Sequence, residues 1–273
     1  MIEKFDLLIC LQGYPDSRPA MEYGLALAEI LHRPVTVLGV TDRSNAAPLE
    51  ELISETTSKL TELGIVYQVV RLRGVLDQVV PQFAQGQNFI TLFNAPPQPV
   101  MRRLVYGGRF RHMMAALDGP IIRVHKVCLP IQKILVSTGA LASAVPIETL
   151  AFELASLTKA RVTLMHVVPP VNLDYEIARE AAAHWKDLLE TDTPQAAHLK
   201  DALERARQLG VEVELCLRHG PVVEEILAQA RAHQYDLIAM GSPYSSHNLR
   251  RLYRPNVTAS VAAEVDCPLI TFH

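Results

Sequence analysis

The sequence predicts an α/β protein with two similar domains, each built around an open five-stranded parallel sheet. Three observations support this fold class. Short apolar runs alternate with amphipathic segments along the chain, which is the pattern of strands connected by helices. Several of these runs are apolar at every residue, as expected for strands covered on both faces. The second half of the chain also repeats the features of the first half in nearly the same order.

The repeat is clearest around the fourth strand of each half. A run at 89–93 is followed by Met-Arg-Arg-Leu, and a run at 236–240 is followed by Leu-Arg-Arg-Leu. Each copy then closes on a short apolar strand after a proline, at 120–124 and at 268–272. A unit repeated over about half of the chain indicates two domains. We expect their limits at 1–127 and 128–273.

In the first half, apolar runs predict the strands and apolar stripes predict the helices. The stripe of Met21, Leu25 and Leu27 is typical of a helix packed on a sheet. Pro81 lies too deep for a first turn, so the third helix should be short or kinked. The expected strands are 7–11, 34–40, 65–72, 89–93 and 120–124. The expected helices are 19–31, 47–63, one around 76–83, and 110–116.

The second half repeats this order of elements. Its long helical stretch contains Thr193-Pro194, which predicts two helices instead of one. Pro221 is suited to the first position of the helix that follows it. The expected strands begin at 134 and cover 161–168, 211–217, 236–240 and 268–272. The expected helices are 146–157, two within 174–209, 222–232 and 257–264.

Composition indicates a globular protein of the cytoplasm. The chain has 273 residues, of which 49% are hydrophobic and 20% charged, well outside the disordered range. The net charge of −3 argues against a nucleic-acid or anionic-membrane partner. The N-terminus leads directly into a strand without a signal segment, and no apolar run approaches the roughly 18 residues of a membrane span.

Nothing in the chain predicts a metal site or a catalytic group. The four cysteines are far apart and form no C-x-x-C motif. Among the ten histidines, His219 and His233 have the most suggestive spacing, but they fall at opposite ends of one predicted helix. No G-x-S-x-G sequence supplies a nucleophile. We therefore expect no metal and nominate no catalytic residue.

With these elements in place, the chain resembles the universal stress protein family in its tandem, two-domain form. The resemblance is carried by the turn at Gly220, the run Asp236-Leu-Ile-Ala-Met-Gly-Ser, Leu-Arg-Arg-Leu, and the ending Val-Asp-Cys-Pro-Leu-Ile. It covers essentially the whole chain and is stronger in the second half. It implies Rossmann-like domains of the adenine-nucleotide alpha hydrolase type, related by a pseudo-twofold axis. It also implies edge pairing of the final strands, 121–124 and 269–272.

The resemblance also implies where a nucleotide would bind. In open parallel sheets, ligands bind beyond the carboxyl ends of strands, where the direction of connection switches. Nucleotide-binding members of the family carry G-x2-G-x9-G-[ST] after the fourth strand, so that phosphates meet a helix N-terminus. In the first half these positions hold Asn94, Pro97, Gly107 and Gly108. The spacing is kept and Gly107-Gly108 should begin a helix, but Pro97 removes a backbone donor.

The second half keeps a different part of the motif. Gly241 and Ser242 remain, Tyr244 takes the place of the second glycine, and Pro255-Asn256 replaces the last Gly-Ser pair one residue late. Asn256 could instead cap the final helix.

Nucleotide-binding members also carry an Asp at the end of the first strand, near the ribose. That position holds Gln12 in the first half and falls at about Gly139 in the second. Gln12 could hydrogen-bond a ribose hydroxyl or be an ordinary polar strand-end residue. Neither half keeps the whole site.

The leading hypothesis is a non-enzymatic tandem universal stress protein that lacks a bound cofactor and acts through protein partners. The alternative is one working pocket for ATP or AMP, in the first half, with the possibility of slow ATP hydrolysis. A nucleotidyl-transferring enzyme is a third class, whose signature motifs the sequence lacks. The sequence does not identify the stress, the pathway or a partner, or whether the chain forms a further homodimer.

Overall fold

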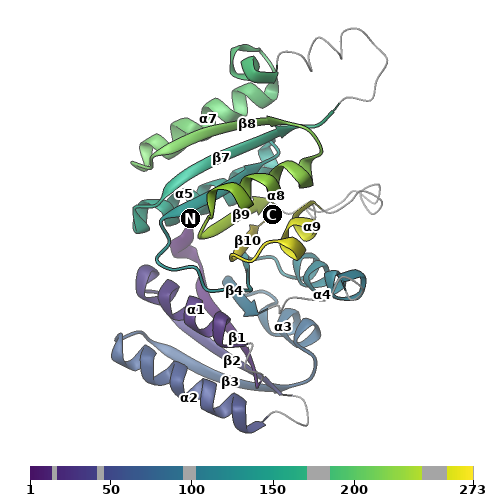
Figure 1. Ribbon diagram of the computed structural model, residues 1–273. Coiled ribbons are helices and arrows are strands. Elements are labelled where there is room, and N and C mark those ends of the chain that lie inside the picture. Colours follow the sequence, from purple (N-terminus) through teal and green to yellow (C-terminus); the bar gives the residue numbers. More distant parts are fainter. Residues whose placement is uncertain (14–16, 42–45, 95–102, 171–184, 242–256, 273) are drawn as a thin grey trace. The chain divides into compact units, whose positions relative to one another are not determined.

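The computed structural model describes residues 1–13, 17–41, 46–94, 103–170, 185–241 and 257–272 (Figure 1). Contacts divide the chain into two compact units. The first contains Met1–Leu129 together with Asp266–Phe272, and the second contains Pro130–Val265. The α/β class predicted from the sequence is confirmed, because strands and helices alternate along both units.

The first unit is a doubly wound sheet of parallel strands in the order β3-β2-β1-β4-β5. Figure 1 shows α1 and α2 on one face of this sheet and α3 and α4 on the other. Both faces of β1 and β2 are therefore buried, as their continuous apolar sequences predicted. The elements are β1 (Asp6–Gln12), α1 (Arg18–Leu31), β2 (Val35–Thr41), α2 (Ala46–Glu62), β3 (Tyr67–Arg73), α3 (Leu76–Ala84), β4 (Phe89–Asn94), α4 (Arg103–Ala116) and β5 (Ile121–Val124), after a short 3-10 helix, η1 (Ile2–Lys4).

The last strand of the chain, β10 (Leu269–Phe272), belongs by its contacts to the first unit. It pairs antiparallel with β5, with Ile270 opposite Ile122. The ring of Phe272 packs edge-on against Phe5, with 5.6 Å between the ring centroids. The expected pairing of the two final strands is confirmed, and it covers backbone groups of β5 that would otherwise form an open sheet edge.

The second unit repeats this architecture with parallel strands in the order β9-β6-β7-β8. Here α5 and α7 lie on one face, and α8 and α9 lie on the other (Figure 1). The elements are β6 (Lys133–Thr138), η4 (Ala142–Ala144), α5 (Val145–Thr158), β7 (Arg161–Val168), η5 (Trp185–Glu190), α7 (Pro194–Gln208), β8 (Val213–His219), α8 (Val222–His233), β9 (Leu237–Gly241) and α9 (Val257–Glu264).

Two predictions about prolines are confirmed and one shifts by a residue. Helix α3 is short, and it contains Pro81. Helix α7 begins at Pro194, and the Thr193 hydroxyl caps it by accepting a hydrogen bond from the Ala196 amide at 3.2 Å. Pro221 precedes the first helical residue of α8 instead of occupying it.

The two units share a hydrogen-bonding register as well as an order of elements. Leu7 pairs with Val35 in the first unit as Ile134 pairs with Val162 in the second, so Leu7 matches Ile134 and Val35 matches Val162. The first helices end in the same way, since the residues after them, His32 and Lys159, both adopt the left-handed conformation. These anchors match the first two strands and the first helix of the two units residue by residue.

The second helices are matched by the turn that follows them. In the first unit the Ile65 amide donates to the carbonyl oxygen of Leu60, and in the second unit the Val211 amide donates to that of Ala206. Leu60 on α2 therefore corresponds to Ala206 on α7. Counting back from this pair gives the counterpart of each residue of α7.

Candidate functional site

Each unit has a crevice position of the kind that binds ligands in doubly wound sheets. In the first unit β1 lies between β2 and β4, and in the second β6 lies between β7 and β9. The chain moves outward along the sheet in opposite directions from these central pairs. The carboxyl ends of β1 and β4, and of β6 and β9, are therefore the switch points where a ligand would sit.

In the first unit, two predicted residues end the two central strands. Gln12 is the last residue of β1 and Asn94 the last residue of β4. The backbone amide of Gln12 donates to the Ser17 hydroxyl at 3.0 Å. This hydrogen bond ties the end of the strand to the residue just before α1. The Asn94 side-chain oxygen is buried and has no hydrogen-bond partner within the described residues. A buried acceptor of this kind is costly and is usually satisfied by a water or a ligand.

The glycine pair of the first unit does not begin a helix. Helix α4 begins at Arg103, so Gly107 and Gly108 lie inside it, in its second turn, and the prediction of a helix over 110–116 was too short. Arg and Leu are good helix formers, whereas each glycine inside a helix costs only about 1 kcal/mol. Phe110 on α4 also packs against Phe93 at the end of β4, with 6.1 Å between ring centroids. The structure therefore does not bring the Gly107 and Gly108 amides to a free N-terminus.

In the second unit, Gly241 ends β9, and its carbonyl oxygen accepts a hydrogen bond from the Thr258 hydroxyl on α9 at 2.8 Å. Gly139 follows β6, and a Cβ atom built on it would meet no atom of the described residues within 4 Å. The predictions for Ser242 and Asn256 lie outside the described residues, although α9 begins at Val257, directly after Asn256.

A buried charged network lies directly beneath the second switch point. Glu148, in the first turn of α5, is fully buried. Its carboxylate accepts hydrogen bonds from the Thr138 hydroxyl at 2.5 Å and from His198 Nε2 at 2.8 Å. Its second oxygen pairs with the Arg205 guanidinium at 2.6 Å. Each carboxylate oxygen is therefore satisfied, and both His198 and Arg205 come from helix α7.

The network extends to the turn after β6. The Thr138 hydroxyl, which donates to Glu148, also accepts a hydrogen bond from the Ala140 amide at 3.0 Å. Ala140 has a φ of 51°, in the left-handed region that costs an alanine roughly 1–2 kcal/mol. A chain of hydrogen bonds thus runs from a strained turn at the switch point, through Glu148, to α7.

Sequence reasoning missed this network. Glu148 and His198 lie 50 residues apart, and no local sequence pattern links them. The repeat could have revealed the network. The position of the first half that corresponds to Glu148 holds the apolar residue Met21, so a charge at this position of the second half stands out.

His166 is buried and hydrogen-bonded, as expected for a histidine within a strand. Its Nδ1 lies 3.0 Å from the carbonyl oxygen of Thr138. Burial lowers the pKa of His166, the Thr138 hydrogen bond opposes this shift, and the nearby His198 adds to it. His166 is therefore neutral at pH 7.

This lowered pKa predicts that acidification destabilises the protein. Below the ordinary histidine pKa of about 6.5, the unfolded chain binds a proton that folded His166 resists. The free energy of unfolding should therefore fall as the pH drops from about 7 towards 5, and this slope should be shallower in His166→Gln. Urea midpoints at several pH values measure the slope. Equal slopes in the two proteins would contradict the prediction. A lower free energy of unfolding of His166→Gln that is the same at every pH would report only the packing lost with the imidazole.

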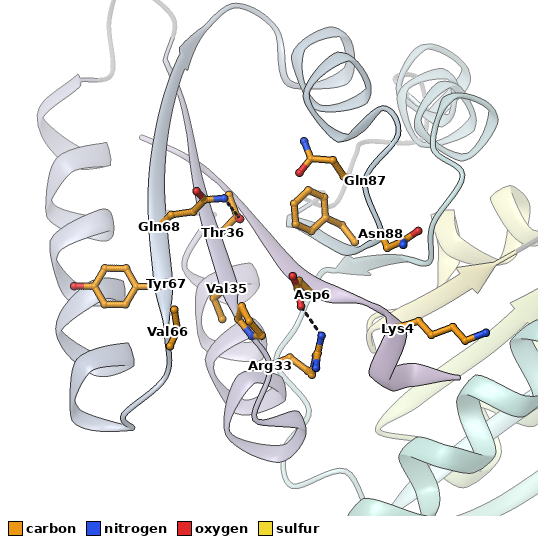
Figure 2. A pocket seen from close by; sticks show the side chains of 12 residues that line it. Lys4, Asp6, Arg33, Val35, Thr36, Val66, Tyr67, Gln68, Gln87 and Asn88 are labelled. Carbon is orange, nitrogen blue, oxygen red and sulfur yellow. Dashed lines mark hydrogen bonds and ion pairs between the residues drawn. The ribbon is translucent and has the colours of Figure 1, made fainter.

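A separate hollow of about 420 Å³ lies at the opposite, amino-terminal ends of β1, β2, β3 and β4 (Figure 2). Arg33 pairs there with Asp6 at 2.8 Å, and the Gln68 amide donates to the buried Thr36 hydroxyl at 2.9 Å. Both contacts are drawn in Figure 2, and Lys4, Gln87 and Asn88 also line the hollow. The hollow is thus distinct from the switch-point crevices, and its Arg33 cation is already paired with a carboxylate.

The part of the chain that the structure describes offers neither a metal cluster nor a membrane helix. Within these residues, no group of three His, Cys, Asp or Glu side chains could hold a metal ion. Among the described helices, none has both the length and the apolar character needed to cross a membrane. The four cysteines are free thiols, of which Cys10 is buried.

Comparison with known families agrees with this architecture. The sequence profile of the universal stress protein family matches residues 130–273, which is more than half of the chain. The protein therefore belongs to the universal stress protein family, and the resemblance predicted from the sequence is confirmed. A comparison with curated protein sequences found no match.

Solved structures show the same fold over nearly the whole chain. A universal stress protein from Archaeoglobus fulgidus is 14% identical with a TM-score of 0.70, covering 98% of this chain and 95% of its own. A putative universal stress protein from Pseudomonas aeruginosa is 13% identical with a TM-score of 0.71, covering 98% and 92%. The cytoplasmic domain of a prokaryotic cation chloride cotransporter is 16% identical with a TM-score of 0.56, covering 98% and 95%. At these identities the likeness concerns the fold alone.

Proposed function

We propose that this universal stress protein is a non-enzymatic stress-response or regulatory protein of the cytoplasm, with degenerate nucleotide sites, that acts through protein partners. The observation that carries the proposal lies at the switch points. Where nucleotide-binding relatives have an Asp at the end of the first strand, this chain has Gln12 and Gly139. Neither can accept hydrogen bonds from ribose hydroxyls with the strength of a carboxylate.

The helix geometry of the first unit supports the same proposal. A phosphate group would be bound by free amides at a helix N-terminus. Because α4 begins at Arg103, the amides of Gly107 and Gly108 fall within the helix instead of at its open end.

The test is to denature purified protein, assay the supernatant for released nucleotide, and titrate native protein with ATP, ADP and AMP by calorimetry. We expect no stoichiometric nucleotide and no binding heat up to about 1 mM ligand. Copurified nucleotide, or a Kd near about 1 μM, would overturn the proposal.

One observation favours a second candidate function, adenine-nucleotide binding in the first unit. The Asn94 side-chain oxygen is a buried acceptor without a partner in the described residues, at the switch point of that unit. An adenine amino group or a ribose hydroxyl would supply the missing donor.

This second candidate is tested by comparing Asn94→Leu with Asn88→Leu. Asn88 is an exposed amide just before the amino end of the same strand, so its replacement controls for a general effect on β4. If a nucleotide binds through Asn94, Asn94→Leu should weaken binding about tenfold and Asn88→Leu should not. Equal affinity of the two variants for a bound nucleotide would contradict this candidate.

A further inference from the structure

The shared register of the two units shows that the charged network of the second unit replaces an apolar cluster in the first. Counted from the matched pair Leu7 and Ile134, Thr138 corresponds to Leu11 and Glu148 to Met21. Counted back from the matched pair Leu60 and Ala206, His198 corresponds to Leu52. The three apolar counterparts, Leu11, Met21 and Leu52, are all buried, with exposed fractions of 0%, 0% and 6%.

The remaining members of the network also have counterparts that play a different part in the first unit. His166 corresponds to Gly39, where an added Cβ would lie 2.8 Å from Ile53 on α2. Arg205 corresponds to Lys59, which pairs with Glu55 on its own helix. The first unit therefore joins its second helix to the sheet through apolar contacts, whereas the second unit uses a buried carboxylate.

The fold itself does not need this carboxylate, since the first unit reaches the same architecture without it. Buried ion pairs are often replaceable by apolar residues of similar volume with little loss of stability. The feature unique to the second unit is the connection that the network makes. It joins α7, through His198 and Arg205, to the strained turn at Ala140 beside the switch point.

We propose that Glu148 is a positioning residue that couples helix α7 to the turn 138–140, so that a change at α7 alters the crevice at the carboxyl end of β6. The coupling follows from the shared carboxylate: when Arg205 moves away, the buried Glu148 carboxylate lacks its charged partner and turns toward water, which breaks its hydrogen bond to Thr138. The Thr138 hydroxyl then no longer holds the Ala140 amide in the left-handed conformation. This proposal rests on the crevice as the site of action, but its test requires no nucleotide.

The test is amide hydrogen exchange on the full chain, comparing Arg205→Met with Arg207→Met. Both arginines lie on α7, but Arg207 pairs with the exposed Glu204 and does not contact Glu148 in the described contacts. Arg205 contacts Glu148 and Thr149, and within the described residues no hydrogen bond joins it directly to the turn. Amides of the first unit, such as Leu38, provide the reference for general effects.

We expect Arg205→Met to speed exchange of the Ala140 amide about tenfold relative to the reference, and Arg207→Met to leave it within about twofold. In a Glu148→Met/His198→Leu background, which installs the residues of the first unit, Arg205→Met should lose this effect on Ala140. If Arg205→Met unfolds the second unit, Arg205→Lys gives the same comparison with an acceleration of about threefold.

Two results would overturn the proposal. The first is that replacing Arg205 speeds exchange of the α7 amides but leaves the exchange rate of the Ala140 amide unchanged. The effect of Arg205 would then be confined to its own helix. The second is an equal acceleration of Ala140 by Arg207→Met, which would show a general loosening of α7. Absence of nucleotide binding would not affect either outcome, so failure of the proposed function is distinguishable from failure of the coupling.

Discussion

Replacing Glu148 with alanine is expected to lower the free energy of unfolding of the second unit by about 3–5 kcal/mol. The substitution removes the acceptor for Thr138, His198 and Arg205 at once. It leaves a cavity and buried polar groups without a partner, both of which are costly. Amide hydrogen exchange of the paired strands β6 and β7, measured over a range of urea concentrations, reports on the stability of the second unit.

The matched control is the triple variant Thr138→Leu/Glu148→Met/His198→Leu, which installs the apolar residues of the first unit. It should lose less stability than Glu148→Ala, because the charge and its hydrogen-bonding partners are removed together and no cavity is left. Arg205, whose side chain is 26% exposed, can turn to water in this variant. A triple variant as unstable as Glu148→Ala would contradict the view that the two clusters are interchangeable in stability.

Gly119→Ala is expected to destabilise the first unit by about 1–3 kcal/mol, towards the upper end of that range. A Cβ atom at this position would lie 2.3 Å from the carbonyl oxygen of Phe89, well inside van der Waals contact. The neighbour is backbone at the start of β4, so relief requires the strand to shift and not a side chain to rotate. Thermal unfolding of the variant, monitored by circular dichroism, measures the cost.

Gly139→Ala serves as the control for this prediction. Within the part of the chain that the structure describes, no atom lies within 4 Å of a Cβ built at Gly139, and its backbone does not require a positive φ. Its stability should stay within about 0.5 kcal/mol of the natural protein. Equal losses in the two variants would show that the close approach at Gly119 relaxes easily.

Local sequence patterns are sufficient to place most helices and strands. Strand β7 (Arg161–Val168) and helix α9 (Val257–Glu264) have the bounds that the sequence predicts. In both, a periodic apolar pattern and the neighbouring residues point to the same element, so no competing signal has to be weighed.

Helix α4 shows where local reasoning fails. The family motif predicts that Gly107 and Gly108 begin a helix. The structure begins the helix at Arg103, since the preceding residues favour helix and Phe110 packs on Phe93. The modest cost of two glycines inside a helix does not outweigh these preferences.

The sequence by itself determined the class of protein, the two-part repeat and the order of strands and helices in each half, because these follow from patterns of neighbouring residues. It also determined that the first-strand positions of both halves, Gln12 and Gly139, lack a carboxylate. Only the tertiary structure decided that Glu148 is buried and shared by partners 10, 50 and 57 residues away. A charge is stable in a core only when such distant donors converge on it, and that convergence depends on how the helices pack on the sheet.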